Sequence, residues 1–406
     1  MYFSPTEERS RKVMPCGSGR TLFHQMLVVL MSAGWAVVLF AGCWTTGAEQ
    51  FANTPAAIDR FARSQEPGEL MERIIQGEAA CGGAEGQSVL RAAYSLKRQE
   101  FDRALFHVAK VSPVGPYRST SLWIAGEALY RTGKLSQSIQ ILNSLISEVP
   151  DDLEGHRCLA AVYFDISAMQ EARIELEHVI RLAPEDYRPH HLLGRIDLDF
   201  EKHAFAISHY RKALELCKVP ERQRELRRGL ARSLRGDRQF AELLETVSPD
   251  DPDPELQTCR ADALWSQAKV EEARKTLDAV LQKEPTLADA LLLSARINLD
   301  SGQLAVAEEQ LKRLLSVDPH NVVARYQLAQ VQRQAGNIEA FQESMQLREQ
   351  TQKLMDELVE LNQQIIDTPG NPDLCLQIAD VAEQLGKQEL AESWRKAAFG
   401  LQTPAQ

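Results

Sequence analysis

The chain has 406 residues, of which 25% are charged and 44% apolar, and its formal net charge is −11. This composition is ordinary for a folded protein, and the length exceeds what a single compact core usually takes. The negative charge argues against binding nucleic acid or anionic lipid by bulk attraction, and we expect no nucleic-acid partner.

The N-terminus combines a basic stretch with an uncharged one. Residues 1–20 hold four Lys or Arg against two Glu, and residues 21–48 contain no Lys, Arg, Asp or Glu. The stretch 26–44 supplies 19 residues, against the roughly 20 that span a hydrocarbon core. Because basic residues mark the cytoplasmic end of a membrane helix, we expect 1–20 in the cytoplasm and the body outside it.

Three fates of segment 21–48 stay open. It remains as a transmembrane anchor, or an ordinary signal peptidase cuts it near Ala48. In the third, Leu39-Phe40-Ala41-Gly42-Cys43 resembles the lipobox of bacterial lipoproteins, which implies lipidation of Cys43. Each fate places the body on the extracytoplasmic side, at the periplasmic or cell-surface side of a bacterial envelope.

Residues 49–84 predict two short helices separated by Pro67-Gly68. Apolar residues at 58, 61 and 62, and again at 70, 74 and 75, follow the helical period. We interpret this segment as a helical cap or spacer ahead of the remaining chain.

An interval of about 34 residues runs through the chain from 85 to 406. Prolines recur at 116, 150 and 184 and again at 252, 285 and 319, and alanine or another small residue recurs between them. These recurrences define units that start near residues 85, 119, 153, 187, 221, 254, 288, 322 and 372. The unit near 221 is the weakest, because Gly229 and Ala241 lie one place off the pattern.

The repeats resemble the tetratricopeptide repeat (TPR) family. Residues 119–152, STSLWIAGEALYRTGKLSQSIQILNSLISEVPDD, match its pattern at Gly126, Leu129, Gly133, Leu142, Leu145 and Pro150. Residues 288–321 match at Ala295, Gly302, Ala307, Leu311, Leu314 and Pro319. The resemblance implies an all-α, right-handed α–α superhelix of about nine helical hairpins, here preceded by one N-terminal apolar helix.

The physical pattern supports the same fold independently. Each unit reads as two amphipathic helices of about a dozen residues, with glycines at 133, 302, 336 and 386 supplying the positive φ that ends a helix. A 34-residue pair cannot bury its own apolar face, so neighbouring pairs have to stack.

The units near 322 and 372 lie 50 residues apart, which predicts a long inserted helix over 338–366. Leu347, Leu354, Leu358, Leu361 and Ile365 fit a heptad seam, with Thr351 as its weak position. Two interpretations stay open: an extended second helix packed within the chain, or a homodimer contact through 345–365.

No pattern of catalysis or of metal binding is present. Six of nine histidines fall between 156 and 209 without HExxH or HxxxH spacing, and the seven cysteines form no CxxC, haem or zinc pattern. Asp250, Asp251 and Asp253 lack the fixed Gly and terminal Glu of a calcium loop. We expect no enzyme, no cofactor and no metal, and cysteines that act as small buried hydrophobes.

In TPR proteins the first helix of each unit lines a concave groove with positions 2, 5, 9, 12 and 13, which share one side of a helix. We call this stripe the first-helix face. The resemblance assigns to it, as partner-binding residues, Trp123, Glu127, Tyr130, Arg131, Arg157, Phe164, Asp165, His191, Arg195, Asp199, Asp262, Trp265, Arg296, Asp300, Tyr326 and Arg333.

These observations predict a membrane-tethered TPR scaffold or assembly factor that binds a protein partner outside the cytoplasm. Two alternatives remain: a structural spacer that dimerises, and a non-catalytic accessory subunit of an envelope enzyme complex.

Overall fold

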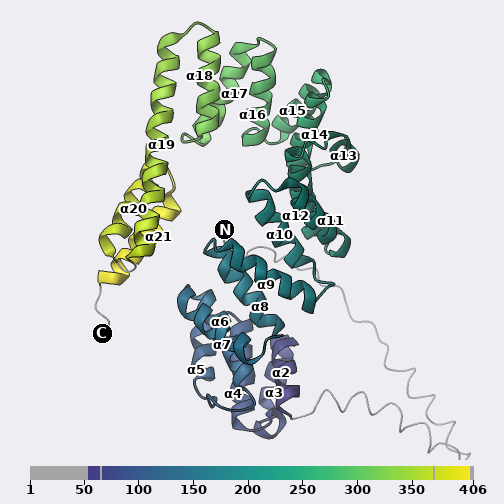
Figure 1. The fold of residues 1–406 in the computed structure, drawn as a ribbon, viewed down its shortest axis with the longest axis vertical. Coiled ribbons are helices and arrows are strands. Elements are labelled where there is room, and N and C mark those ends of the chain that lie inside the picture. Colours follow the sequence, from purple (N-terminus) through teal and green to yellow (C-terminus); the bar gives the residue numbers. More distant parts are fainter. Residues whose placement is uncertain (1–53, 65, 369–370, 403–406) are drawn as a thin grey trace, which may run out of the picture. The chain divides into compact units, whose positions relative to one another are not determined.

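The computed structural model describes residues 54–64, 66–368 and 371–402. Every regular element in these ranges is helical (Figure 1). The predicted segments 1–20 and 21–48, with Cys43, lie outside the described residues. Within the described ranges, no helix combines the length and the apolar character needed to cross a membrane.

Nine helical hairpins follow one another along the described chain, so the predicted all-α hairpin fold is confirmed. Their first helices begin at 84, 118, 153, 187, 220, 254, 288, 322 and 372, each within one residue of the predicted unit start. The hairpins are α4 (Ala84–Lys97) with α5 (Phe101–Val108), α6 (Arg118–Arg131) with α7 (Leu135–Glu148), α8 (Leu153–Asp165) with α9 (Met169–Leu182), α10 (Tyr187–Asp199) with α11 (His203–Leu216), α12 (Pro220–Gly236) with α13 (Phe240–Thr246), α14 (Pro254–Ser266) with α15 (Val270–Lys283), α16 (Ala288–Asp300) with α17 (Leu304–Val317), α18 (Val322–Gln334) with α19 (Ile338–Asp367), and α20 (Pro372–Gln384) with α21 (Gln388–Gln402).

The turn inside each hairpin uses one residue with positive φ. Four of these residues are the predicted glycines, with φ between 70° and 78°. The other five turns place a residue with a Cβ in this region at φ between 56° and 63°: Gln99, Ser167, Glu201, Arg238 and Ala268. The turn geometry is therefore general to the hairpins, whereas glycine is not.

Small residues let neighbouring helices approach closely. A Cβ at Gly126 in α6 would lie 2.5 Å from a methyl of Leu142 in α7. Farther along, the buried Tyr210 ring of α11 fills the space over Gly194 and Gly229, and a Cβ at Gly229 would lie 2.2 Å from it. The small-residue positions in the sequence are therefore packing positions.

The structure divides into two compact units. Unit 1 ends at Leu193 and unit 2 begins at Gly194, so the boundary falls inside α10. Ahead of its hairpins, unit 1 also contains α2 (Pro55–Ser64), α3 (Pro67–Ile75) and a short 3₁₀ helix, η2 (Glu78–Cys81).

The weak repeat near 221 departs from the others in both helices. Helix α12 has 17 residues and α13 has seven, whereas α14 has 13 and α15 has 14. The turn residue Arg238 accordingly falls late in the unit.

The insertion after 338 forms one continuous helix, α19, of 30 residues. Leu358 and Leu361 are buried against α20, with Leu354 and Ile365 packed partly against the same cluster. The seam is thus used for packing inside the chain, which is the first of the two interpretations.

Candidate functional site

The first helices of successive hairpins pack side by side in each unit. In unit 1, α6 lies against both α4 and α8. In unit 2, α14 lies between α12 and α16, and α16 also contacts α18. Side chains on the first-helix face can therefore meet across hairpin boundaries, and several of them do.

A polar cluster occupies this face where α6 meets α8. The Tyr130 hydroxyl donates to Asp165 Oδ2 at 2.6 Å, and burial together with this bond raises the pKa of Tyr130. Glu127 is mostly buried, and burial raises the pKa of its carboxyl, while Arg131, with Nη2 at 3.7 Å from Oε1, opposes the shift. Arg131 itself is exposed. This cluster holds a carboxylate that is only weakly neutralised.

Trp123 does not lie on an open surface, which corrects the expectation from the repeat pattern. Its side chain is only 5% exposed and belongs to the same core cluster as Ile58 and Ala62 of α2. The guanidinium of Arg63 stacks over its ring at 5.1 Å from the ring centre. Helix α2 therefore covers this part of the first-helix face.

Arg63 also fixes α2 to more distant hairpins. Its Nη1 and Nη2 atoms contact the two carboxylate oxygens of Asp152 at 3.1 and 2.8 Å. Asp59 accepts a hydrogen bond from Thr120 of α6, and Lys97 Nζ donates to the Arg63 carbonyl oxygen at 3.3 Å. The sequence did not predict the contacts of α2 with α6 and Asp152, because no local pattern indicates that a helix packs against residues 60 to 90 positions away.

Arg157 is likewise engaged within the chain. It pairs with Glu154 at 2.5 Å and with Asp186 at 2.7 Å, and its side chain is largely buried. Phe164 is half-buried beside the exposed Asp165. On α10, His191 and Arg195 are half-buried and make contacts of their own, and Asp199 is exposed.

In unit 2 the face centres on Asp262 of α14. Arg235 of α12 lies 3.9 Å from Asp262 and 3.9 Å from Asp289 of α16, so it bridges three first helices. Burial raises the pKa of the Asp262 carboxyl, and these long contacts offset the effect only in part. Beside it, the exposed Arg296 places its guanidinium 4.7 Å from the ring centre of Trp265.

The remaining predicted residues of unit 2 are open to solvent. Asp300 and Arg333 are exposed, and Tyr326 is 46% exposed with Arg348 of α19 over its ring at 5.3 Å. The structure thus brings Asp262, Trp265 and Arg296 together and leaves the α18 residues near α19. Arg348 was not part of the predicted set because the family pattern places no second-helix residue on this face.

The histidine-rich region makes structural contacts. His156 is buried, with Nδ1 2.5 Å from Glu175 and Nε2 2.8 Å from the Pro150 carbonyl oxygen, and it stacks on His178. Across residues 54–402, gaps apart, no three His, Cys, Asp or Glu side chains are grouped to hold a metal ion. Cys81, Cys158, Cys217, Cys259 and Cys375 are buried and not disulfide-bonded.

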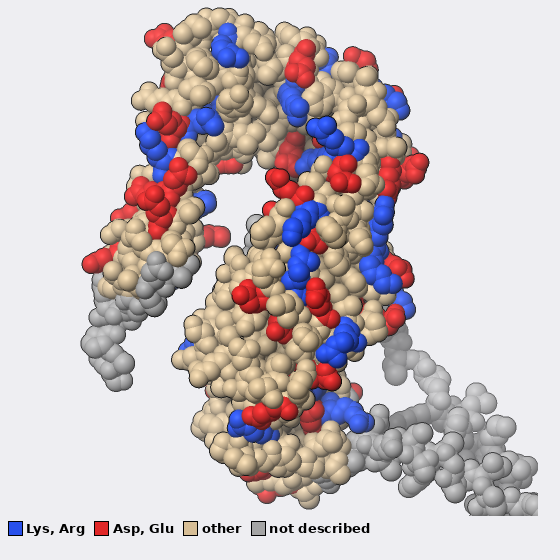
Figure 2. Space-filling model, in the orientation of Figure 1, with Lys and Arg blue, Asp and Glu red and all other residues tan. Residues whose placement is uncertain are grey.

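Acidic residues of the 250–255 loop are also engaged. Asp251 pairs with Arg227, and Asp253 pairs with Arg228 at 2.8 Å while its Oδ1 caps the N-terminus of α14. On the face seen in Figure 2, acidic and basic side chains lie beside one another in many places. This surface is typical of a protein that neutralises its charges locally.

Three tetratricopeptide repeat family profiles match the chain, at residues 120–152, 260–309 and 298–359. The matched residues lie on the α6–α7 hairpin in unit 1 and on helices α14 to α19 in unit 2. Together with the nine hairpins, they show that the chain belongs to the tetratricopeptide repeat family. No curated protein sequence matches the chain.

Several solved structures are similar to this chain at low identity. A tetratricopeptide repeat protein from Parabacteroides merdae is 18% identical, over 61% of this chain and 98% of that one, with a TM-score of 0.43. YrrB, a TPR protein with an unusual peptide-binding site, is 16% identical over 50% and 88%, with a TM-score of 0.33. The human IFIT1 dimer with PPP-AAAA is 14% identical over 87% and 92%, with a TM-score of 0.36. At these values the likeness says nothing about what this chain binds.

Proposed function

We propose that this protein is a non-catalytic scaffold that binds a protein partner along the open part of its first-helix face. The observation that carries the proposal is the same in each unit: a mostly buried carboxylate on the first-helix face, Glu127 in unit 1 and Asp262 in unit 2. Each lies more than 3.6 Å from its nearest basic group and has a raised pKa. Ionised carboxyls in this setting destabilise the free protein, and basic side chains of a partner would relieve the cost.

The packing of α2 supports a helical partner. Helix α2 is amphipathic, buries Ile58 and Ala62 against the first hairpins, and places Arg63 over Trp123. It therefore provides, within the chain, an example of a helix seated by apolar contact plus an arginine on this face. Helix-in-groove binding uses the same combination of apolar anchors and flanking charges.

The aromatic and arginine side chains around the two carboxylates suit such an interface. Tyr130 and Arg131 flank Glu127, and Trp265 and Arg296 flank Asp262. Tyr, Trp and Arg are the residues that most often dominate interface energies. The binding residues we propose are therefore these six, with Trp123 and Arg157 as residues that hold the fold.

The test is recovery of partners on the immobilised full chain from a membrane extract. We expect Glu127→Lys with Asp262→Lys to reduce recovery at least about tenfold, because each reversal replaces attraction by repulsion at a desolvated site. Arg313→Ala, on the exposed side of α17, is the matched control. Circular dichroism checks that all variants stay helical, and equal recovery by the double variant would overturn the assignment.

We also propose that segment 21–48 tethers the protein to a membrane with its repeats on the extracytoplasmic side. The support is its sequence: an uncharged stretch long enough to span, preceded by basic residues. Intact-mass analysis of the mature protein is the test. A retained N-terminus or a lipidated Cys43 is expected, and an unlipidated chain that starts after residue 48 would overturn the tether.

A further inference from the structure

The second helix of the α12–α13 hairpin is half the usual length. Helix α13 has seven residues, whereas α7, α9, α11, α15 and α17 each have 14. At 1.5 Å per residue it is about 10 Å shorter. Arg260 ends it by donating from Nη1 to the carbonyl oxygens of Leu244 at 3.1 Å and Val247 at 2.7 Å, and Pro249 and Pro252 follow.

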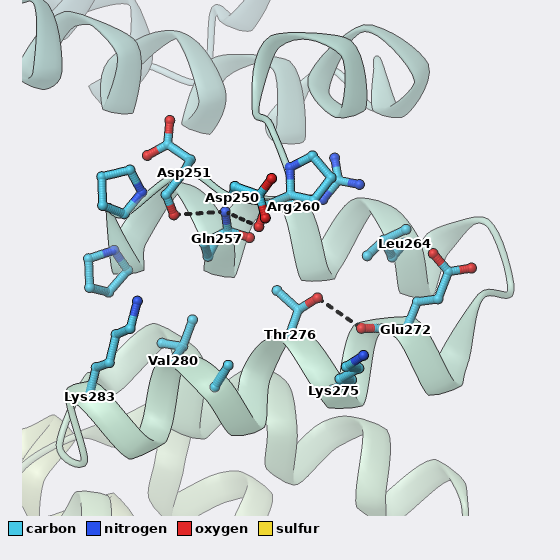
Figure 3. Close-up of a pocket in the computed structure, with 14 residues that line it drawn as sticks. Asp250, Asp251, Gln257, Arg260, Leu264, Glu272, Lys275, Thr276, Val280 and Lys283 are labelled. Atoms are coloured by element: carbon cyan, nitrogen blue, oxygen red, sulfur yellow. Dashed lines mark hydrogen bonds between the residues drawn. The ribbon is translucent and has the colours of Figure 1, made fainter.

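In a full hairpin the missing half covers the next first helix. Leu145 and Ile146, in the second half of α7, pack so tightly on α8 that a Cβ at Gly155 would lie 3.0 and 2.8 Å from them. Where α13 stops, a pocket of about 600 Å³ lies on α14 and α15 instead (Figure 3). We call it the α14–α15 notch. It is lined by Pro249, Asp250, Asp251, Pro252, Pro254, Gln257, Arg260, Leu264, Glu272, Lys275, Thr276, Ala279, Val280 and Lys283.

The loop that borders the notch is held in place. Gln257 Nε2 donates to the carbonyl oxygens of Ser248, Pro249 and Asp251 at 2.8, 3.1 and 3.0 Å, as the dashed lines in Figure 3 show in part. The Asp251 carboxylate is paired with Arg227. The notch is therefore preformed, and its occupant would not have to order this loop.

The notch combines an apolar floor with two free cations on one edge. Ala279 is exposed on the floor, and Leu264 and Val280, each 3% exposed, lie beneath it as part of the core. Lys275 and Lys283 are exposed and have no ion pair or hydrogen bond within the described residues. They lie eight residues apart on one side of α15, about 12 Å along its axis.

Acidic side chains are present at other parts of the rim. Asp250 lies on the bordering loop, across the notch from α15, and Glu272 lies at the first turn of α15. Of the α15 residues from 275 to 283 that line the notch, the charged ones are both lysines, because the exposed Asp278 is not part of the lining. The loop edge carries the negative charge of Asp250. An occupant therefore has to carry acidic groups on the edge that faces the two lysines of α15, and none on the edge that faces the loop.

We propose that the α14–α15 notch binds a short amphipathic helix of a partner protein whose α15-facing edge is acidic. The helix would lie where the second half of α13 is missing. From Glu272 to Lys283 the floor is about 16 Å long, which fits about three helical turns. Two acidic residues seven positions apart would face Lys275 and Lys283, and apolar residues between them would cover Ala279.

This site is separate from the first-helix face. Neither Asp262 nor Trp265 lines the notch, and position 262 lies about 200° around the helix from the lining positions 260 and 264. Helix α15 contributes no predicted partner-binding residue. The two sites can therefore be tested by different variants of one protein.

The test uses a phage-displayed library of 15-residue helical peptides, panned on the full chain. We expect enriched peptides to carry Asp or Glu seven positions apart. Fluorescence anisotropy should show that Lys275→Glu with Lys283→Glu weakens their binding at least about tenfold, since two attractive contacts become repulsive. Lys396→Glu, an exposed lysine of α21, makes the same kind of charge change elsewhere and should leave binding unchanged.

A second variant tests the notch without changing charge. Ala279 is exposed on the notch floor, so Ala279→Trp should fill the pocket and abolish binding while the protein keeps its helicity and melting temperature. Enriched peptides that lack acidic pairs, or that bind these variants as well as the parent protein, would overturn the proposal. Failure to enrich any peptide would overturn it as well, and the outcome is independent of the Glu127 and Asp262 variants.

Discussion

At the scale of single residues, the hairpin turns place either glycine or a residue with a Cβ at the same positive-φ position. Gly302 and Ala268 occupy equivalent turn positions with φ of 74° and 62°. A Cβ added at Gly302 would meet nothing within 4 Å. The difference between the two residues at this site is therefore one of backbone conformation, since a Cβ disfavours positive φ.

We expect Gly302→Ala to lower the free energy of unfolding by about 1 kcal/mol, because alanine pays the left-handed penalty. Ala268→Gly should change it in the opposite direction by a similar amount. Thermal denaturation of the two variants beside the parent protein gives the measurement. Shifts of the same sign in both variants would contradict this account.

A pH effect follows from Asp262. Burial raises the pKa of its carboxyl in the folded protein, with Arg235 opposing the shift. A raised folded pKa gives a stabilising contribution that is complete below the unfolded pKa of about 4 and is lost as the pH rises through the folded pKa. Ionised Asp262 therefore costs stability at neutral pH.

Asp262→Asn should accordingly raise the melting temperature at pH 7, and the difference should shrink as the pH falls toward 4. Melting curves between pH 3.5 and 7.5 measure it. Asp278→Asn, at an exposed position of α15, is the control and should leave the melting temperature unchanged. A variant that melts below the parent protein at pH 7 would show that the Arg235 contact outweighs burial.

At the scale of helices, α19 shows how one pattern supports two interpretations. Leu358 is 8% exposed and packs against α20, whereas Leu347 of the same heptad seam is 37% exposed. Leu358→Ala should lower the free energy of unfolding by about 2 kcal/mol or more by leaving a cavity. Leu347→Ala should cost far less, and urea unfolding at two protein concentrations separates packing from dimerisation.

If both variants lost the same free energy of unfolding, and if the protein unfolded at lower urea when diluted, the seam would instead pair two chains. A monomeric protein with the larger loss at Leu358 would agree with the structure. The heptad spacing alone could not decide, because the same apolar stripe serves a partner helix in the chain or in a second copy.

The first helices could be located from the sequence to within one residue, because small residues and prolines fix where each hairpin starts. The lengths of α12 and α13 could not be predicted from the sequence. Arg238, a non-glycine, sits at the positive-φ turn, and Arg260, far along the chain, ends α13 by capping its carbonyls. Such a tertiary cap leaves no local pattern in residues 240–250.

At the scale of the whole chain, nearest-neighbour packing predicts local responses to damage. Each described hairpin buries its core between its own two helices and against adjacent hairpins, as Leu142 does in unit 1 and Ile378 does in unit 2. Leu142→Ala should reduce amide-exchange protection in α6–α8 and leave α20–α21 unchanged, and Ile378→Ala should do the reverse. Hydrogen exchange followed by mass spectrometry makes the comparison.

A uniform loss of protection in both variants would indicate one cooperative core instead. The repeat pattern predicted the stacked hairpins and which side of each first helix is shared. It did not predict which residues on that side stay open. Trp123 is engaged by Arg63, which lies outside its repeat, and Arg157 pairs with Asp186 at the far end of its own repeat.

The position of α2 has a practical consequence for anyone preparing shortened versions of this protein. Arg63 alone spans from this helix to Asp152 at the start of α8. A chain begun at the first repeat would bare the Trp123 indole and leave the Asp152 carboxylate without its guanidinium. The exposed indole would favour non-specific association, and the unpaired carboxylate would add local negative charge. Truncations intended for crystallisation or binding work should therefore start before Pro55.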